Sequence, residues 1–451
     1  MVKMKKETSF RIGFTVILML LLSSTCLIYG QGFEEWSANI GGDDTERLRD
    51  IKETSDNGFI AVGSIEDFQS DDNNLFMVKT DAAGIVEWSM DHGGESDDAA
   101  NSIAIAGDGG YIIVGETASS GEGLKDLWLV KTDAQGTVIW EKTMGGPKID
   151  SANNVLVDDD ESILITGLTA SAGAGSYDLW VIKTDNAGNT LWNKTFGGKM
   201  GDIGHSAVHT SDGGYMVVGE TSSYGQGWND VWLLKLTSEG VPVLNITFGG
   251  SKDDRGKSIK ETSDGSYIVV GSTESFGEGL RDVYLIKIDT EGNLEFEKTY
   301  GESNEEYGMA VELSEKGGYM IVGDKYTDTS DFQVWLLEVD GSGEILGDLS
   351  FGGTIGDWSN AILGTSDDGY IIAGRTWSFG SGGDAYLIKI TMDEPELEPE
   401  PEVEPEPEPE PETETEPEES SGIPGFPISS ILLSFALIVL YLKSDIILLR
   451  Q

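Results

Sequence analysis

Seven acidic residues occupy one position of a recurring pattern and are the first candidates for chemistry. Each stands five residues after a recurring glycine: Glu46, Asp98, Asp150, Asp202, Asp254, Glu306 and Asp357. In the structural interpretation, a carboxylate in such a loop accepts backbone N–H groups and holds the turn. In the alternative, the seven acids form a ring that gathers cations, because close carboxylates raise one another's pKa values or recruit metal. The sequence leaves both interpretations open.

Tandem acids are a weaker signal for a metal. Asp43-Asp44, Asp71-Asp72 and residues 158–160 could supply oxygen ligands to calcium. None of them has the ligand spacing of the EF-hand loop. We therefore predict no bound cofactor, and calcium is the one metal that stays open.

Aromatic residues gather in the longest loop of several repeats. Four stand five residues past the glycine that precedes this loop, and three more lie nearby: Phe68, Tyr224, Phe276 and Phe379, then Trp228, Tyr326 and Trp377. Aromatic rings among acids and glycines suit stacking on a glycan or contact with a surface protein. The alternative is that these rings pack between adjacent repeats.

Signals for an enzyme are poor. The chain has one Cys and three His, and between residues 31 and 392 it has only five arginines, which are scattered along the sequence: Arg47, Arg49, Arg255, Arg281 and Arg375. No Ser-His-Asp set, nucleophile elbow or phosphate loop is visible. The net charge of −51, from 29 Lys and Arg against 80 Asp and Glu, argues against nucleic acid as a partner.

These residues sit in seven repeats of about 52 residues. The repeat glycines are Gly41, Gly93, Gly145, Gly197, Gly249, Gly301 and Gly352. Each unit holds four short runs rich in Val, Ile, Tyr and Trp and bounded by Gly, Asp and Ser, a pattern that predicts antiparallel strands. An Asp-x-x-Gly turn, as at Asp81/Gly84 and Asp133/Gly136, suits a hairpin whose glycine takes a positive φ.

The two ends of the array predict a closed ring. The seventh unit stops after its third strand, near Thr391, whereas the chain begins with a spare strand around Trp36. Pairing the two gives an all-β, seven-bladed β-propeller over residues 31–392, without the exposed edges that an open array would leave. An open solenoid is the rival architecture, but it leaves this complementarity unexplained.

The repeats resemble the kelch-type β-propeller. The resemblance rests on an apolar strand ending in glycine ("DGGYIIVG", ending at Gly115), an alternating strand ("DLWLVKTD", 126–133) and a Trp-bearing strand. The second glycine of the kelch pair is replaced here by Ser64, Glu116, Leu168, Glu220, Ser272, Asp324 and Arg375. The Asp-x-x-Gly-x-x-x-Trp stretch is also similar to quinoprotein-type propeller repeats. This likeness indicates the fold and says little about function.

The two termini predict an address outside the cell. Basic residues and then an uncharged apolar run up to Tyr29 are typical of a secretory signal over residues 1–30. Residues 393–421 form an acidic Pro/Glu-rich stretch, which we expect to be a disordered, extended stalk. Residues 422–451 contain an apolar run with a basic end, which predicts a transmembrane helix or a sorting signal. With its Pro424-Gly425-Phe426, this tail resembles the C-terminal sorting signals of archaeal surface proteins, in which the tail can be exchanged for a lipid.

The expected function is binding, adhesion or an envelope role on the extracellular face of the cell membrane. The membrane would be reached through the C-terminal segment, and a glycan or a surface protein would be the partner. The alternative is an extracellular enzyme, either a glycan hydrolase or a quinone-dependent oxidoreductase. Asn193 and Asn245 begin Asn-x-Thr sequences on the expected outer strand and are candidates for glycosylation.

Overall fold

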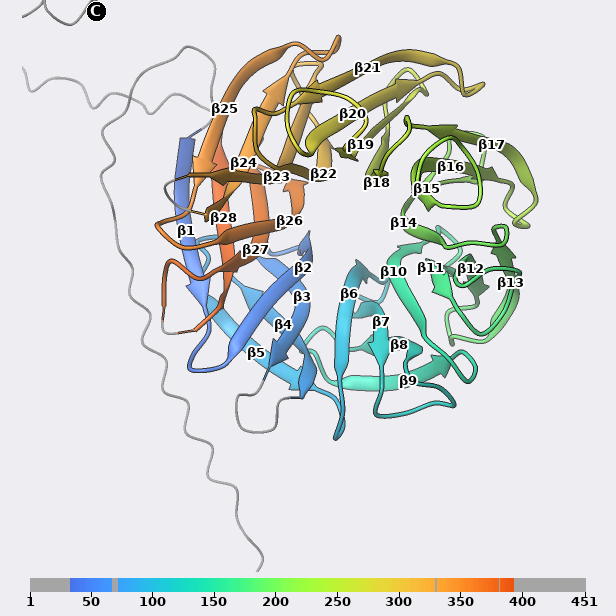
Figure 1. Cartoon of the computed structure of the whole chain (residues 1–451). Coiled ribbons are helices and arrows are strands. Elements are labelled where there is room, and N and C mark those ends of the chain that lie inside the picture. Colours follow the sequence, from blue (N-terminus) through green and yellow to red (C-terminus); the bar gives the residue numbers. More distant parts are fainter. Residues whose placement is uncertain (1–32, 67–71, 329–330, 381, 393–451) are drawn as a thin grey trace, which may run out of the picture. The chain divides into compact units, whose positions relative to one another are not determined.

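The computed structural model describes residues 33–66, 72–328, 331–380 and 382–392, and these residues form 28 β-strands and no helix. The strands make seven antiparallel sheets of four strands each. Figure 1 shows the sheets as blades around a common centre. The seven-bladed all-β propeller predicted from the repeats is therefore confirmed.

The innermost strands surround the centre of the ring, and each contacts the innermost strand of both neighbouring blades. In order from blade 1 to blade 7 they are β2 (Thr45–Glu53), β6 (Asp98–Ile105), β10 (Asp150–Val157), β14 (Asp202–His209), β18 (Asp254–Glu261), β22 (Glu306–Leu313) and β26 (Asp357–Gly364). The second strands are β3 (Phe59–Glu66), β7 (Tyr111–Thr117), β11 (Ile163–Thr169), β15 (Tyr215–Thr221), β19 (Tyr267–Thr273), β23 (Tyr319–Thr327) and β27 (Tyr370–Thr376).

The third and fourth strands complete each blade toward its outer edge. The third strands are β4 (Asn73–Thr80), β8 (Asp126–Thr132), β12 (Asp178–Thr184), β16 (Asp230–Leu236), β20 (Asp282–Ile288), β24 (Asp331–Val339) and β28 (Asp384–Thr391). The outer strands of blades 1 to 6 are β5 (Val86–His92), β9 (Val138–Met144), β13 (Thr190–Phe196), β17 (Pro242–Phe248), β21 (Leu294–Tyr300) and β25 (Ile345–Phe351).

The first strand of the chain closes the ring. β1 (Phe33–Ile40) pairs antiparallel with β28 and becomes the outer strand of blade 7, with Phe33 opposite Thr391 and Ile40 opposite Ala385. The spare Trp-bearing segment therefore completes the incomplete last unit, as predicted. The two ends of the propeller are therefore held together by antiparallel strand pairing, which has one register shift between Glu34 and Trp36.

Burial explains why the strands differ in sequence. Every residue of β8 is buried, because neighbouring blades cover both faces of the middle strands, and a continuous apolar run results. The outer strand β9 instead alternates between half-buried and exposed residues. The apolar core lies between the blades: one cluster joins Leu48 and Phe59 of blade 1 to Ile371 and Leu387 of blade 7.

The tryptophans of the outer strands pack against the hairpin glycines of the next blade. Gly136 and Gly188 take φ values of +82° and +72°, as the Asp-x-x-Gly turns predicted. A Cβ on Gly136 would lie 2.9 Å from the ring of Trp88 in the preceding blade, and one on Gly188 equally close to Trp140. The tryptophan of each of these outer strands therefore packs on the next blade's turn, where only glycine leaves room.

The termini lie outside the described residues. This applies to the predicted signal over 1–30, the stalk over 393–421 and the anchor over 422–451. Within the described ranges, no helix is long and apolar enough to cross a membrane.

Candidate functional site

One face of the propeller carries the turns with the repeat glycines and the loops between the second and third strands; we call it the loop face. The two kinds of loop touch directly: the backbone N–H of Asp254 donates to Asn229 O at 2.9 Å, and that of Glu274 donates to Asp253 O at 2.9 Å. The acids and the aromatic residues singled out from the sequence belong to this face.

The recurring acid ties these loops together. Asp254 is fully buried; it accepts hydrogen bonds from the Gly250 N–H and the Ser275 hydroxyl, both at 2.7 Å, and from the Thr273 hydroxyl. Asp202 does the same with Gly198, Ser223 and Thr221. The carboxylates of Asp98, Asp150 and Asp357 likewise each accept a glycine N–H and a serine hydroxyl. These five acids therefore hold the turns of the loop face by accepting hydrogen bonds, as the structural interpretation expects.

The two glutamates differ from the five aspartates. Blades with aspartate carry Thr-x-Ser at the end of the second strand, whereas blade 1 has Ile65 and Asp67 there, and blade 6 has Lys325 and Thr327. Glu46 Oε2 and Glu306 Oε1 are buried without a hydrogen-bond partner. Burial, and then the charges of Asp384 and Asp44, raise the pKa of Glu46 to about 8. Burial, followed by the Asp282 charge, also raises the pKa of Glu306.

A second set of acids was missed from the sequence. Six third strands begin with aspartate, and in five of them this aspartate pairs with the threonine of the Thr-x-Ser sequence: Asp126, Asp178, Asp230, Asp282 and Asp384. A Cβ on Gly145 would lie 2.1 Å from Asp126 Oδ1 and 2.7 Å from Asp150 Oδ2, so the repeat glycine sits between two carboxylates. At the closure, Gly41 sits in the same way between Glu46 and Asp384. The recurrence of Asp at the start of each "DLWLVKTD"-like run was the available signal.

The described side chains can also be compared with the requirements of a metal site. Among the described residues, no group of three or more His, Cys, Asp or Glu side chains is placed to hold a metal ion. Of the tandem acids, Asp71 lies outside the described residues. Asp158 accepts hydrogen bonds from His209 at 2.9 Å and Tyr215 at 2.5 Å, and pairs with Lys183.

The aromatic residues are both packed and exposed. The rings of Tyr224, Phe276 and Phe379 lie 5.7–5.8 Å from those of Trp232, Tyr284 and Tyr386, each on the third strand of its own blade. Tyr224 and Phe276 still keep 43% and 39% of their surface exposed. Trp228 is 74% exposed, and Trp377 and Tyr326 are also exposed. Phe68 lies outside the described residues.

The innermost strands share a bulge that the sequence did not reveal. The register shifts by one residue in each of them, which leaves one unpaired residue per blade: Arg49, Asn101, Asn153, His205, Lys257, Met309 and Asn360. The amides of Asn101, Asn153 and Asn360 donate to Ala152 O, Gly204 O and Leu48 O, each at 2.7 Å. Bulge side chains therefore stitch neighbouring blades together, including across the ring closure.

The five arginines that are scattered in sequence lie in two places, in both cases toward the loop face of the blades. Arg47 and Arg255 lie two residues into β2 and one residue into β18, and Arg375 pairs in register with Trp358 near the start of β26. Arg49 is the bulge residue of β2, and Arg281 directly precedes β20. They form two groups: the paired arginines, Arg255 and Arg281, and the closure arginines, Arg47, Arg49 and Arg375.

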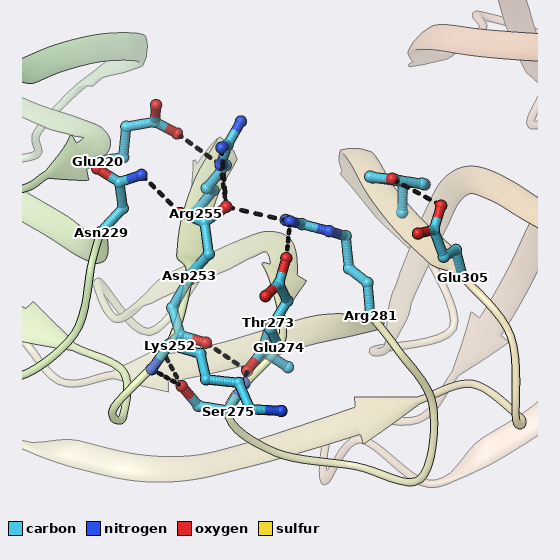
Figure 2. A network of polar contacts seen from close by, with 12 residues as sticks. Glu220, Asn229, Lys252, Asp253, Arg255, Thr273, Glu274, Ser275, Arg281 and Glu305 are labelled. Carbon is cyan, nitrogen blue, oxygen red and sulfur yellow. Dashed lines mark hydrogen bonds and ion pairs between the residues drawn. The ribbon is translucent and has the colours of Figure 1, made fainter.

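The paired arginines are neutralised by acids (Figure 2). Arg255 lies 2.8 Å from Asp253 and 3.5 Å from Glu220, whereas Arg281 lies 3.0 Å from Asp253 and also contacts Glu274. Although burial opposes it, hydrogen bonds from Asn229 and the two arginines hold the pKa of Asp253 below its usual value.

The closure arginines lack such partners. Within the described ranges, none of the three forms an ion pair. Arg47 Nε is buried without a hydrogen-bond partner, Arg49 donates to the neutral Asn101 amide, and the Arg375 guanidinium stacks 4.3 Å from the centre of the Trp358 ring. Burial, and then the positive charge of Arg47, lower the pKa of both Arg49 and Arg375.

The glycosylation candidates lie on outer strands. Asn193 is exposed on β13, and Asn245 is exposed on β17. Asn245 Oδ1 accepts the Trp232 indole N–H at 2.7 Å, which leaves its amide nitrogen available. Both positions are therefore accessible.

Comparison with known proteins shows no family for this chain. No protein-family model matches the chain, and no curated protein matches it either. The WD40 domain of Neurospora crassa Pan2 superposes with a TM-score of 0.49 at 10% identity, covering 78% of this chain and 90% of that domain. YCF48 bound to a D1 peptide gives 0.47 at 13% identity, covering 82% and 100%. A Dyadobacter fermentans protein of unknown function gives 0.47 at 10% identity, covering 81% and 100%.

Proposed function

We propose that this protein is a binding propeller of the cell surface, whose loop face docks a glycan or a surface protein. The C-terminal segment would hold it at the outer face of the membrane, and the acidic stalk would space it from the bilayer. The apolar and basic pattern of both termini supports this address.

The observation that carries the proposal is that aromatic rings on the loop face are half-exposed and each packs on another aromatic ring of the same blade. Tyr224 and Phe276 occupy equivalent positions in successive blades and keep more than a third of their surface exposed. Each ring packs against an aromatic residue of the third strand, and this contact restricts its orientation before a ligand arrives. Rigid, half-exposed rings lose little side-chain entropy on binding and offer a flat apolar face to a sugar or a protein.

A glycan array probed with the purified propeller tests this function. We expect selective binding that is lost in the Trp228→Ala variant and in the Tyr224→Ala/Phe276→Ala double variant. Leu191→Ala is the matched control, because Leu191 is an exposed apolar residue on outer strand β13. Equal binding by all variants would reject the loop face as the docking surface. Glycosidase turnover, or a visible absorption band from a bound quinone, would favour the enzyme alternative instead.

A further inference from the structure

The closure arginines form a concentration of positive charge in a strongly acidic protein. They come from β2 and β27, strands that contact one another across the junction of blades 1 and 7. The chain as a whole carries a net charge of −51. Three guanidinium groups gathered at one junction of such a chain, without ion pairs among the described residues, repel one another at a free-energy cost.

Three neighbouring acids offset part of this charge: Glu116 acts on Arg49, and Asp324 and Glu66 act on Arg375. Glu116 is bound to Lys125 at 2.7 Å. Asp324 is buried, and its Oδ1 accepts the Ser359 N–H at 2.7 Å and hydroxyl at 2.9 Å. Burial raises the pKa of Asp324 to about 7, so this carboxyl is partly protonated at neutral pH. Asp324 is therefore a weak partner for Arg375.

There is space next to the arginines. A cavity of about 200 Å³ lies between blades 1 and 2; Arg47, Arg49 and Lys125 line it together with three carboxylates, and Arg375 does not. Each of the three carboxylates has a partner of its own: Asp97 accepts from Asn73, Asp98 from Gly94 and Ser119, and Glu116 from Lys125. At roughly 30 Å³ for each water molecule, it holds several waters or one small oxyanion. Arginine N–H groups match the oxygens of carboxylate, sulfate and phosphate in geometry as well as in charge.

We propose that Arg47 and Arg49, which line this cavity, and the neighbouring Arg375 form a binding site for an oxyanion group beside the innermost strand of blade 1. The group is a carboxylate or a sulfate of the docked ligand, such as an acidic sugar. The unpaired N–H of Arg47 supplies the central hydrogen bond, and the other two guanidinium groups supply charge. Assigning the group to the docked ligand rests on the proposed function, whereas anion binding by the arginines themselves is tested without the aromatic residues.

Thermal unfolding and calorimetric titration test the site, with inorganic sulfate and glucuronate as probes. Ionic strength is kept constant with sodium chloride, because sulfate also stabilises proteins generally at high concentration. We expect both anions to raise the melting temperature of the wild type saturably, as a ligand of the folded state does, and neutral glucose to have no effect. A response to only one anion tells a sulfate site from a carboxylate site.

Matched variants assign the effect to these arginines. Arg47→Gln/Arg375→Gln should bind both anions about tenfold more weakly or worse, and Arg47→Lys should lie between it and the wild type, because lysine keeps the charge without the fork. Lys142→Gln/Lys298→Gln removes two charges from outer strands and should respond as the wild type does. Tyr224→Ala/Phe276→Ala should keep the anion response even if it loses glycan binding.

Two outcomes would overturn the site. One is an unchanged titration in Arg47→Gln/Arg375→Gln, with folding verified by its melting curve. The other is a wild type that responds to neither anion, which would mean that carboxylates of the chain itself neutralise the arginines.

Discussion

The junction of the last and first blades and the junction around Asp253 place arginines in similar positions but balance charge in opposite ways. Around Asp253, two arginines share a buried carboxylate and are flanked by Glu220 and Glu274. At the closure, three arginines have no ion-pair partner among the described residues, and the nearby Glu46 and Asp384 each keep a buried oxygen without a hydrogen bond.

The arginines around Asp253 are ion-paired and stabilise the fold, whereas the closure arginines form no ion pair within the described part of the chain and are available to a ligand. A buried ion network is strongly destabilised when one member is removed, because the remaining charges stay behind unpaired. Unpaired groups of a binding site instead cost stability until the ligand arrives. The two junctions should therefore respond with opposite signs to the removal of an arginine, and with different dependence on pH.

Removing Asp253 should give the largest effect. Asp253→Ala leaves Arg255 and Arg281 without their shared carboxylate, and we expect a loss of about 3–5 kcal/mol in the free energy of unfolding. Urea unfolding measures it. Thr45 occupies the equivalent position in blade 1, so Thr45→Ala is the matched control, with an expected loss of ~1 kcal/mol. A loss below that of the control would show that the network contributes little to stability.

The closure junction should lose stability as pH rises. The pKa of Glu46 is raised from 4.5 to about 8 in the folded protein, so the folded state holds a proton that the unfolded state has released. This contribution is complete below about pH 4.5 and is lost as pH rises toward 8. Glu46→Gln stays neutral, so we expect it to become more stable than the wild type by on the order of 2–4 kcal/mol above pH 8.

Unfolding curves of the two proteins between pH 5 and 9 measure this difference. Asp324, with its pKa of about 7, gives the same direction of change in both proteins and cancels in the comparison. Parallel stability profiles for the wild type and Glu46→Gln would contradict a protonated Glu46.

The architecture could be predicted because its information repeats along the chain. The period, the Asp-x-x-Gly turns and the spare strand around Trp36 each specify the propeller by local pattern, and β1 pairs with β28 accordingly. The loop role of the five aspartates also follows from their position. The sequence also shows that the two blades with glutamate at this position, Glu46 and Glu306, are the two that lack Thr-x-Ser. The reason becomes clear only from the structure, in which hydroxyls of the Thr-x-Ser sequence donate to the aspartate of the other blades.

The arginine groups could not be predicted in the same way. Arg47 and Arg375 are far apart in sequence and meet only because the ring closes, and Arg281 reaches Asp253 from a neighbouring loop. The bulges were hidden for a related reason: one unpaired residue per innermost strand leaves the 52-residue period unchanged. Side chains that act between blades are specified by topology, which a scan along one chain does not show.

The loop-holding hydroxyls should make a smaller contribution than Asp253. Ser275→Ala removes a hydrogen bond at 2.7 Å to Asp254 and a second at 3.0 Å from the Lys252 N–H. We expect a loss of about 1–2 kcal/mol, because the buried carboxylate keeps its other donors. The exposed Ser238→Ala is the control and should change little. Equal melting temperatures for the two variants would mean that water replaces the serine hydroxyl.

The smallest expected effect comes from replacing one arginine at each junction, and this pair of variants compares the two junctions most directly. Arg47→Gln removes a repelling charge and should raise the free energy of unfolding by about 0.5–1 kcal/mol at low salt, whereas Arg255→Gln removes two ion pairs and should lower it by a similar amount. Both changes should shrink in 1 M salt, where the screening length falls to about 3 Å. Urea unfolding at both salt concentrations checks the signs. If the two variants shift in the same direction, the closure arginines are balanced by the chain itself, and no charge is held there for a ligand.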